Sequence, residues 1–190
     1  MTPTPMRVHL ESERLRLRRF TPADAALLYD LDGDPDVIRF TDLGGRAPYA
    51  HYCDRVLPRN LAYYGRGEGY GYWALEEKAS GDFLGWFHFR PAQDDSGEIE
   101  LGCRLKRSAW GRGYATEMAR ALVCHGFATL GVPRITATAL AANRASVRVL
   151  EKAGLRFHGD WTYEFTDPAT GRVTPHPAVR YALDRRDYAP

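Results

Sequence analysis

The sequence predicts one α/β domain that spans residues 1–190 and contains a mixed sheet of about seven strands with about four helices. The length of 190 residues fits a single domain and is enough to bury a sizeable core. The composition, with 44% hydrophobic and 26% charged residues, is typical of a globular protein and excludes a disordered chain, a collagen repeat or a disulfide mini-protein. Segments with the two-residue period of strands are interleaved with segments of helical period, which indicates the α/β class.

The first elements are a strand and a short helix. Leucines alternate with arginines over residues 13–19, which predicts a half-buried strand. A helix is expected to begin after Thr21, whose side chain can cap it, while Asp24 can return a hydrogen bond to the cap residue. Gly33 can end this helix.

The middle of the chain predicts a helix followed by three strands. A second helix is expected over residues 48–64, with a break at Pro58 because proline disrupts a helix interior. Strands are expected over 70–75, 83–89 and 98–105. The glycine inside the last of these indicates a bulge or a close backbone approach.

The last third begins with the clearest helix. Apolar residues recur with a 3.6-residue period over 112–130, and a short strand at 135–140 follows. A helix is expected over 145–153. Alternating aromatic residues at 161–166 and apolar residues at 179–183 then predict a hairpin.

Charge and cysteine content exclude several classes of protein. The 26 Lys and Arg residues against 24 Asp and Glu give a net charge of only +2, which argues against a nucleic-acid groove or a membrane-binding face. No apolar run is long enough to span a membrane, and the N-terminus lacks the apolar core of a signal peptide, so a cytoplasmic location is expected. The three cysteines form no CxxC pair and the histidines have no metal spacing, so no metal site is expected.

A glycine-containing segment links the strand expected over 98–105 to the helix expected over 112–130. The segment is Trp110-Gly111-Arg112-Gly113-Tyr114-Ala115. The first N–H groups of a helix lack intrahelical partners, and the helix dipole adds positive charge there, so a phosphate can bind if glycines let it approach. The alternative is a tight turn that needs glycine for a positive φ. The sequence contains no P-loop motif, and Thr116 breaks the dinucleotide-binding GxGxxG pattern.

This junction resembles the pyrophosphate-binding motif of the GNAT N-acetyltransferase superfamily, Gln/Arg-x-x-Gly-x-Gly/Ala. Gly113 and Ala115 match the motif, while Trp110 replaces its first residue in the way that is typical of the RimJ/RimL-type branch, which acetylates the N-termini of ribosomal proteins. Further stretches agree in order along nearly the whole chain: residues 13–18, 99–102, 143–146, 150–155 and 179–183.

The resemblance implies a GNAT fold in which two parallel strands splay apart to form a cleft for acetyl-CoA, the co-substrate. The residues implied to hold its pyrophosphate are Trp110, Gly111, Arg112, Gly113, Tyr114 and Ala115. The pantetheine arm is expected to pair with the backbone of Cys103 and Leu105. A bulge near Leu101-Gly102 is expected to splay the strand and to free an N–H for the oxyanion.

The resemblance also implies catalytic residues. Asn143 corresponds to the residue that hydrogen-bonds the pantetheine, although it can equally cap the next helix. Ser146 stands where this branch is proposed to protonate the leaving thiolate, and Leu150 occupies the place of the tyrosine acid found in many relatives. Glu100 is the leading candidate for the base that accepts the amine proton, and Glu164 is the second. Each of these polar residues also has an ordinary structural explanation, and water or a neutral amine would remove the need for a base.

The acceptor is expected to be a primary amine, with a protein or peptide N-terminus ranked first. A small-molecule amine such as an antibiotic, a polyamine or an amino-acid analogue is the alternative, and a non-catalytic CoA-binding module is a further one. The acceptor side is expected to include Tyr29, Asp36, Arg39, Phe40, Tyr63, Tyr64 and the hairpin over 161–177. A polycationic acceptor would favour carboxylates, which Asp94, Asp95, Asp160 and Glu164 could supply. The protein is expected to be a monomer or a homodimer.

Overall fold

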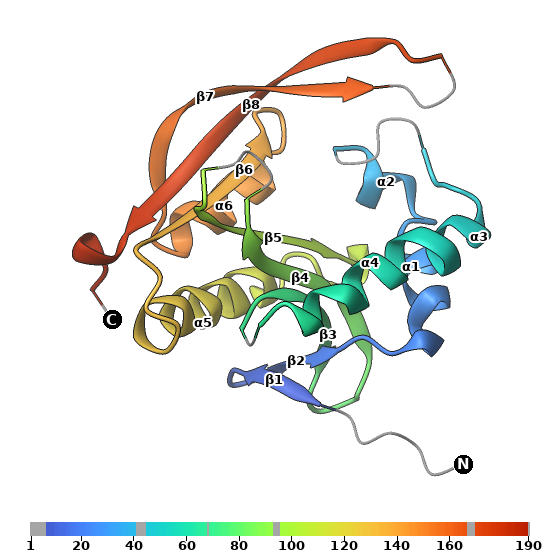
Figure 1. Ribbon diagram of the computed structural model, residues 1–190, viewed down its shortest axis with the longest axis horizontal. Coiled ribbons are helices and arrows are strands. Elements are labelled where there is room, and N and C mark those ends of the chain that lie inside the picture. Colours follow the sequence, from blue (N-terminus) through green and yellow to red (C-terminus); the bar gives the residue numbers. More distant parts are fainter. Residues whose placement is uncertain (1–6, 41–44, 68, 93–95, 167–169, 190) are drawn as a thin grey trace.

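The computed structural model describes residues 7–40, 45–67, 69–92, 96–166 and 170–189. Within these ranges the chain forms one sheet of eight strands in the order β1-β2-β3-β4-β5-β6-β8-β7 (Figure 1). Neighbouring strands are antiparallel except β5 and β6, which are parallel. The strands are β1 (Val8–Glu11), β2 (Leu15–Arg19), β3 (Gly71–Glu77), β4 (Phe83–Pro91), β5 (Ile99–Leu105), β6 (Arg134–Leu140), β7 (Arg156–Thr166) and β8 (Val173–Asp184).

Helices connect the strands at the positions that the sequence predicts, except for the short helix α2, which the sequence analysis did not predict. They are α1 (Ala25–Leu31), α2 (Pro35–Ile38), α3 (Tyr49–His51), α4 (Leu57–Ala62), α5 (Tyr114–Ala128) and α6 (Arg144–Lys152). The mixed α/β architecture is confirmed, with β1 as an additional edge strand. The helix expected over 48–64 is interrupted by a π-helical turn at Tyr52–Val56, and Pro58 lies in the first turn of α4, where its missing N–H costs nothing. Within the described residues, no helix is long and apolar enough to cross a membrane.

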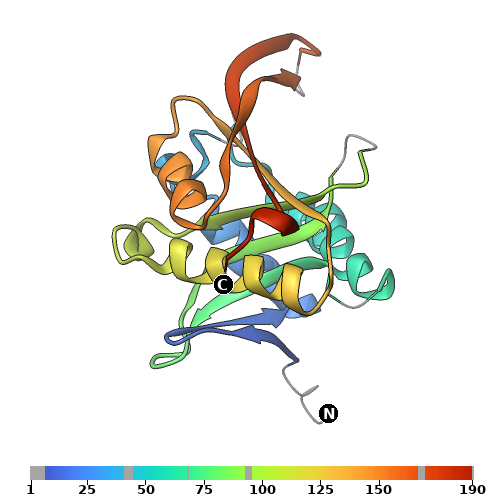
Figure 2. The same cartoon turned by 90° about the vertical axis from the view of Figure 1, so that its left-hand side faces the viewer.

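The sheet separates two apolar cores. Met118 and Leu122 of α5 and Val147 of α6 pack on one face of the sheet. Leu28 of α1 and Leu57 of α4 pack on the other face. Figures 1 and 2 show the same division, with α5 and α4 on opposite sides of the central strands. Both faces of β3 and β4 are therefore covered, which explains why β4 carries large apolar residues on both faces, with Phe87 and Phe89 in one core and Phe83 and Trp86 in the other.

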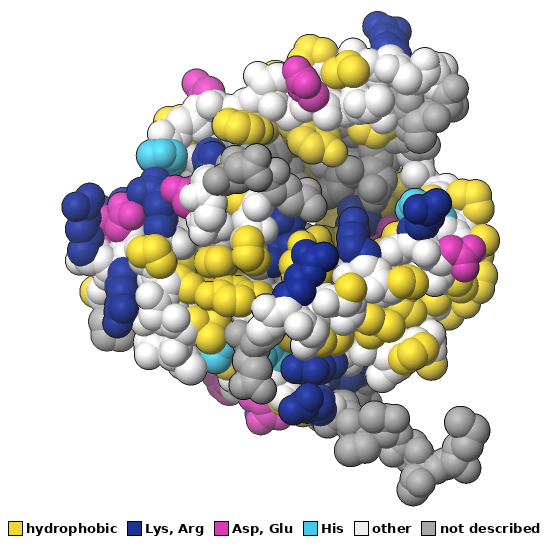
Figure 3. Space-filling model, viewed as in Figure 1, with side chains coloured by type: hydrophobic (Ala, Val, Ile, Leu, Met, Phe, Trp, Pro, Cys, Tyr) yellow, Lys and Arg dark blue, Asp and Glu magenta, His cyan; other side chains and the backbone are white. Residues whose placement is uncertain are grey.

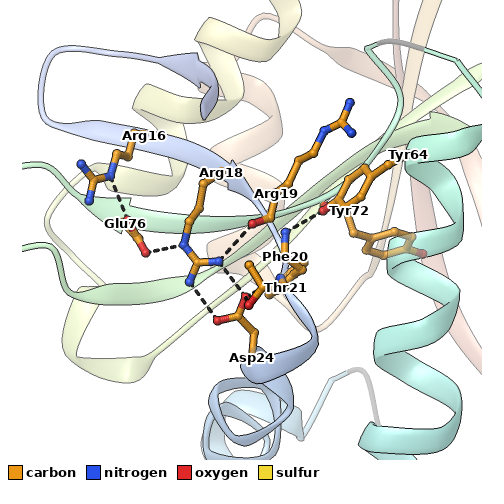
Figure 4. Close-up of polar contacts among 9 residues, drawn as sticks. All are labelled: Arg16, Arg18, Arg19, Phe20, Thr21, Asp24, Tyr64, Tyr72 and Glu76. Atoms are coloured by element: carbon orange, nitrogen blue, oxygen red, sulfur yellow. Dashed lines mark hydrogen bonds and ion pairs between the residues drawn. The ribbon is translucent and has the colours of Figure 1, made fainter. Parts of the chain in front are cut away.

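A buried ionic network joins the first helical turn to the sheet (Figure 4). The Arg18 guanidinium donates through Nη1 to Asp24 Oδ2 at 2.7 Å and through Nε to Glu76 Oε1 at 2.6 Å. The Asp24 carboxylate also accepts from the Thr21 backbone N–H at 2.7 Å, as the sequence predicts for the helix start. Each buried charge is thus paired, which such burial requires. The network fixes the start of α1 against β2 and β3.

Strands β5 and β6 pair only at one end. The paired residues are Ile99 with Ile135 and Glu100 with Thr136, and the two strands part beyond them. The expected bulge near Leu101-Gly102 is wrong, because the register between β4 and β5 is continuous. Beyond Glu100, β5 remains paired with β4 but is no longer paired with β6. The strands therefore splay by divergence of β6, without an extra residue in β5.

The C-terminal hairpin extends past the sheet. Strand β8 pairs with β6 as far as Ala178, and from there to Val173 it pairs only with β7. Figures 1 and 2 show this part of the hairpin arching away from the body. The hairpin thus forms a wall above the place where β5 and β6 separate.

Candidate active site

A cleft of about 500 Å³ lies where β5 and β6 separate. Its walls come from β4, β5, β6, α5, α6 and the β7–β8 hairpin. In Figure 3 the surface is hollowed below the hairpin, with basic and hydrophobic side chains around the hollow. The structure brings Glu100, Cys103, Asn143 and Ser146 together on these walls. The turn over 110–115 lies outside the lining, at the start of α5.

Glu100 lies on the wall formed by β5 and is held by an arginine. Arg90, which is paired with Glu100 in the sheet register, approaches Glu100 Oε2 with its Nη2 atom at 2.8 Å. Arg90 also donates through Nε to the Tyr72 hydroxyl at 3.0 Å. The Arg90 side chain is 7% exposed and that of Glu100 is 24% exposed, so the ion pair is shielded from water while the carboxylate still borders the cleft. This arrangement places one negative charge at a fixed position beside the cleft.

His88 lies next to this ion pair. Its Nε2 atom is 3.7 Å from Glu100 Oε2. A Cβ atom on Gly102 would lie 2.5 Å from the imidazole, so glycine is required here for close approach. Burial lowers the pKa of His88 well below its usual range, and the positive charges of Arg90 and Arg59 lower this pKa further. The imidazole is therefore neutral at pH 7.

Asn143 and Ser146 lie together at the start of α6. The Asn143 side-chain Oδ1 accepts a hydrogen bond from the Ser146 backbone N–H at 3.2 Å, so Asn143 caps the helix. This bond uses the serine backbone and leaves the Ser146 hydroxyl unconstrained by the cap. Leu150 follows one turn later on the same wall, where it contributes only apolar surface.

The Cys103 thiol is not poised for nucleophilic chemistry. Burial raises the pKa of this thiol to about 12, so it stays protonated at neutral pH. A thiolate is the reactive form of cysteine. Cys103 therefore contributes its backbone and its apolar surface to the cleft wall.

The glycine-containing turn presents the first N–H groups of a long helix. Gly111 and Gly113 have φ values of 71° and 81°, a region that side chains disfavour, and Gly113 is the N-cap of the 15-residue helix α5. Trp110 donates through Nε1 to the Leu105 carbonyl at 2.9 Å and so ties the turn to the end of β5. The Arg112 guanidinium lies over the Tyr114 ring and 3.4 Å from Glu77 Oε1.

Comparisons with known proteins agree with this geometry. The sequence profile of the family described as "Acetyltransferase (GNAT) domain" matches residues 14–156. The chain belongs to this acetyltransferase family. It is 32% identical to the uncharacterized protein YkkB of Bacillus subtilis, over 78% of this chain and 85% of that protein. It is 28% identical to an Aspergillus fumigatus protein named FsC-acetyl coenzyme A-N(2)-transacetylase, over 94% of this chain and 77% of that protein. The ribosomal-protein-S5-alanine acetyltransferase of Vibrio fischeri shares its fold, with a TM-score of 0.73, 15% identity, and coverage of 98% of this chain and 100% of that chain.

Few of the residues expected on the acceptor side of this GNAT acetyltransferase line the cleft. Phe40 does, together with Trp161 and Tyr163 of the hairpin. Thr162 and Glu164 alternate with these aromatic residues and so point to the opposite face of β7, which removes Glu164 from the cleft. The expected carboxylates Asp94 and Asp95 lie outside the described residues.

The remaining acceptor-side residues have other contacts. Tyr29 packs edge-on against Tyr52. Asp36 forms ion pairs with Arg39 and Arg107, at 3.8 Å and 3.3 Å. The Tyr64 hydroxyl accepts from the Phe20 backbone N–H at 2.8 Å and donates to the Tyr72 carbonyl, as Figure 4 shows. Tyr63 lines a second hollow of about 450 Å³ with Arg66 and Tyr70, and this hollow meets the cleft at Ala92. Asp160 is exposed.

Sequence reasoning missed His88, Arg90 and Arg180, all of which line the cleft. Arg180 donates to Glu98 Oε2 at 2.8 Å and lies over the Trp161 ring. The sequence contains a weak indication that His88 and Arg90 act together, because they lie two residues apart and so share one face of a strand. Which strand lies beside β5, and in which register, depends on the fold and cannot be obtained from this spacing.

Proposed function

We propose that this GNAT acetyltransferase moves the acetyl group of acetyl-CoA to the α-amine of a protein or peptide, by direct attack in a ternary complex. The observation that carries the proposal is the cleft at the β5–β6 separation, with Glu100 on one wall and Ser146 on the other. Trp110 supports placing the chain in the RimJ/RimL-type branch.

The described residues fit acetyl-CoA. Beyond Glu100, β5 has no neighbour on its β6 side, so an extended pantetheine arm has a strand edge to pair with near Cys103. The N-terminus of α5, opened by Gly111 and Gly113, suits a diphosphate. Arg112 lies in the same turn and its side chain is 52% exposed, so it can leave Glu77 for a phosphate. Bound acetyl-CoA supplies an acyl carbon with a good leaving group.

The chemistry requires a neutral amine, a stabilised oxyanion and a proton for the thiolate. In our proposal Glu100 receives the first amine proton, and the amine lone pair then forms the C–N bond. A backbone N–H of the free β5 edge stabilises the oxyanion. The C–S bond breaks, and the Ser146 hydroxyl delivers a proton to the sulfur while it takes the second amine proton. Asn143 keeps Ser146 in place by capping α6.

The side chains around the cleft favour an acceptor without several positive charges. Arg90 and Arg180 line the cleft with Glu100 as the one carboxylate among its described lining residues. A polyamine or a polycationic antibiotic would place further positive charge beside two arginines, which disfavours binding. A peptide N-terminus brings a single ammonium group, and Trp161 and Tyr163 offer apolar surface to the residues that follow it.

A small uncharged acceptor with one amine is the second candidate. The name of the Aspergillus fumigatus relative, an acetyl coenzyme A-N(2)-transacetylase, supports transfer to nitrogen outside the ribosomal-protein group. Its similarity extends over 94% of this chain.

A panel of acceptors tests the proposal. The protein is mixed with acetyl-CoA and with short peptides, the same peptides blocked at the N-terminus, a polyamine and single small amines, and thiol release is followed. We expect kcat/KM to be highest for free N-terminal peptides and lost on blocking. A higher kcat/KM for a small amine would select the second candidate. Tight CoA binding without turnover on any amine would instead indicate a non-catalytic CoA-binding module.

A further inference from the structure

The second hollow, of about 450 Å³, opens beside the cleft. Its lining residues are Tyr63, Arg66, Tyr70, Pro91 and Ala92, and the last of these also lines the cleft. Ala92 follows Arg90 by two residues, so the hollow begins about 7 Å along the chain from the arginine that holds Glu100. The hollow therefore continues the cleft on the side of the proposed base.

A row of contacting side chains joins Glu100 to the hollow. Arg90 approaches Glu100 Oε2 with its Nη2 atom at 2.8 Å and donates through Nε to the Tyr72 hydroxyl at 3.0 Å. The Tyr72 ring packs against the Tyr63 ring, with a centroid distance of 5.5 Å. The Arg66 guanidinium lies over the Tyr63 ring, 4.9 Å from its centroid. Arg66 thus stands at the end of a packed row that starts at the proposed base.

Arg66 differs in its charge balance from the two arginines that line the cleft. Arg90 is paired with Glu100, and Arg180 is paired with Glu98 at 2.8 Å. Arg66 is exposed and forms no ion pair within the part of the chain that the structure describes. Its positive charge at the hollow is therefore not neutralised by a neighbouring carboxylate.

Arg59 of α4 adds a second positive charge on the same side. Its guanidinium lies over the Tyr72 ring, 5.3 Å from the centroid, and forms no ion pair with a described residue. The charge of Arg59 is one of the causes that lower the pKa of His88, so its field reaches the cleft wall. Arg59 and Arg66 together make the surface between the cleft and the hollow attractive to an anion.

Two phenol hydroxyls complete the donor groups of the hollow. The hydroxyls of Tyr63 and Tyr70 make no hydrogen bond with a described residue, and the Tyr70 ring is stacked on Phe89 at a centroid distance of 6.3 Å. Guanidinium and phenol groups both donate hydrogen bonds to carboxylates. The described lining contains no carboxylate that would compete for these donors. A carboxylate is therefore the ligand group that the hollow suits best.

We propose that the hollow is a subsite for a carboxylate on the second or third residue of the acceptor, selected by Arg66. This inference rests on the proposed acetyl transfer to a peptide α-amine. An extended peptide advances by about 3.5 Å per residue, so two residues cover the ~7 Å from Arg90 to Ala92. An Asp or Glu side chain and the C-terminus of a very short peptide both present this group.

Peptides that differ by one charge test the subsite. One set carries an amidated C-terminus and either Glu or Gln at the second or third residue, and a second set consists of tripeptides with a free or an amidated C-terminus. We expect kcat/KM to be about tenfold higher for the peptide with the carboxylate in at least one set, mainly through a lower KM. The set that shows the preference identifies the source of the carboxylate. Equal kcat/KM within every pair would overturn the subsite.

Substitutions of Arg66 assign the preference to the hollow. The side chain is exposed, so its replacement is expected to leave the fold intact. In Arg66→Gln we expect the ratio of kcat/KM between the charged and the uncharged peptide to fall to about 1. In Arg66→Glu we expect this ratio to fall below 1, with a Lys peptide preferred over the Gln peptide. An undiminished ratio in Arg66→Gln would overturn the subsite.

Arg120→Gln is the matched control. Arg120 is an exposed arginine of α5, which lies across the sheet from α4 (Figures 1 and 2), and it donates through Nε to the Lys152 carbonyl at 2.8 Å. We expect this variant to keep the wild-type ratio. The same loss in Arg120→Gln as in Arg66→Gln would indicate a general effect of surface charge and would overturn the subsite.

The assay separates failure of the subsite from failure of the proposed function. Wild-type acetylation of peptides without any dependence on a carboxylate overturns the subsite alone. A preference that Arg66→Gln removes and Arg120→Gln retains supports the subsite. Absence of wild-type thiol release with every amine overturns the proposed function and the subsite together.

Discussion

At the scale of single residues, burial decides which polar groups can react. Cys103 borders the cleft, yet burial raises the pKa of its thiol to about 12 and keeps it protonated. Ser146 borders the same cleft, and its hydroxyl is left unconstrained by the cap that Asn143 makes with its backbone. We therefore expect Ser146 to transfer a proton and Cys103 to remain unreactive.

Alkylation distinguishes the cysteines. We expect Cys103 to react with iodoacetamide at pH 8 at least about tenfold more slowly than the exposed Cys124, because the thiolate is the nucleophile. Peptide mass spectrometry over time measures both rates. We also expect Cys103→Ala to retain most of its turnover. Rapid labelling of Cys103, or complete loss of turnover in Cys103→Ala, would disagree with a protonated and non-catalytic thiol.

Ser146→Ala tests the proton donor. We expect kcat to fall by about tenfold to 100-fold while the Kd for acetyl-CoA changes by less than about threefold, since only proton transfer to the thiolate is removed. The helix cap survives because it uses the serine backbone N–H. Steady-state kinetics and calorimetry measure the two quantities. An unchanged kcat would return Ser146 to the role of an ordinary first-turn helix residue.

At the scale of elements, the start of α5 combines a backbone requirement with an electrostatic one. Gly113 has a φ of 81° and caps a 15-residue helix whose first N–H groups have no intrahelical partners. Any side chain at this position strains the backbone, and an acidic one also repels a phosphate. The two effects can be separated by comparing substitutions.

Gly113→Glu and Gly113→Ala form a matched pair. Both carry the cost of a left-handed φ, about 1 to 2 kcal/mol, but only glutamate adds negative charge at the helix N-terminus. We expect Gly113→Glu to bind acetyl-CoA at least about tenfold more weakly than Gly113→Ala in calorimetry, with the fold retained in both. Equal affinities in the two variants would contradict binding of the pyrophosphate at this turn.

Much of this element structure follows from the sequence. The alternation and helical periods predict the strands β2 to β6 and the helices α5 and α6, because their signals are local. The register that places Arg90 beside Glu100 is not local, since it depends on strands separated by a turn of the chain. A bulge at Leu101-Gly102 was expected to explain both the glycine in β5 and the separation of β5 from β6, and this explanation is wrong. Gly102 is needed for the approach of His88, and β6 provides the splay.

At the scale of the whole molecule, buried histidines connect the fold to pH. His9 of β1 stacks on Trp73, with a centroid distance of 4.1 Å, and meets His125 of α5 edge-on. Burial lowers the pKa of His9 to about 4, with the charges of His125 and Arg19 as smaller causes. Burial also lowers the pKa of His125. These rings join the edge of the sheet to α5, so their protonation bears on the stability of the whole domain.

The free energy of unfolding is expected to decrease below pH 6.5. A histidine with a lowered pKa in the folded protein binds a proton more readily when unfolded, so its contribution is intact above pH 6.5 and is lost as the pH falls to about 4. Because the His9 ring is only partly buried, solvent screening keeps the loss below the ~3 kcal/mol that the full shift would correspond to. Urea titrations at pH 7 and pH 4 measure the difference. His9→Phe keeps the stacking and should reduce this pH dependence, whereas an unchanged dependence would assign it to other groups.

The measurement that tests acetyl transfer most directly follows both products in one reaction. Wild-type protein, acetyl-CoA and a peptide with a free N-terminus are incubated, and the released thiol and the acetylated peptide are quantified together. The cleft chemistry predicts one acetyl group on the peptide α-amine for each thiol released. Thiol release without an acetylated amine, or no release while acetyl-CoA binds, would contradict transfer in the β5–β6 cleft.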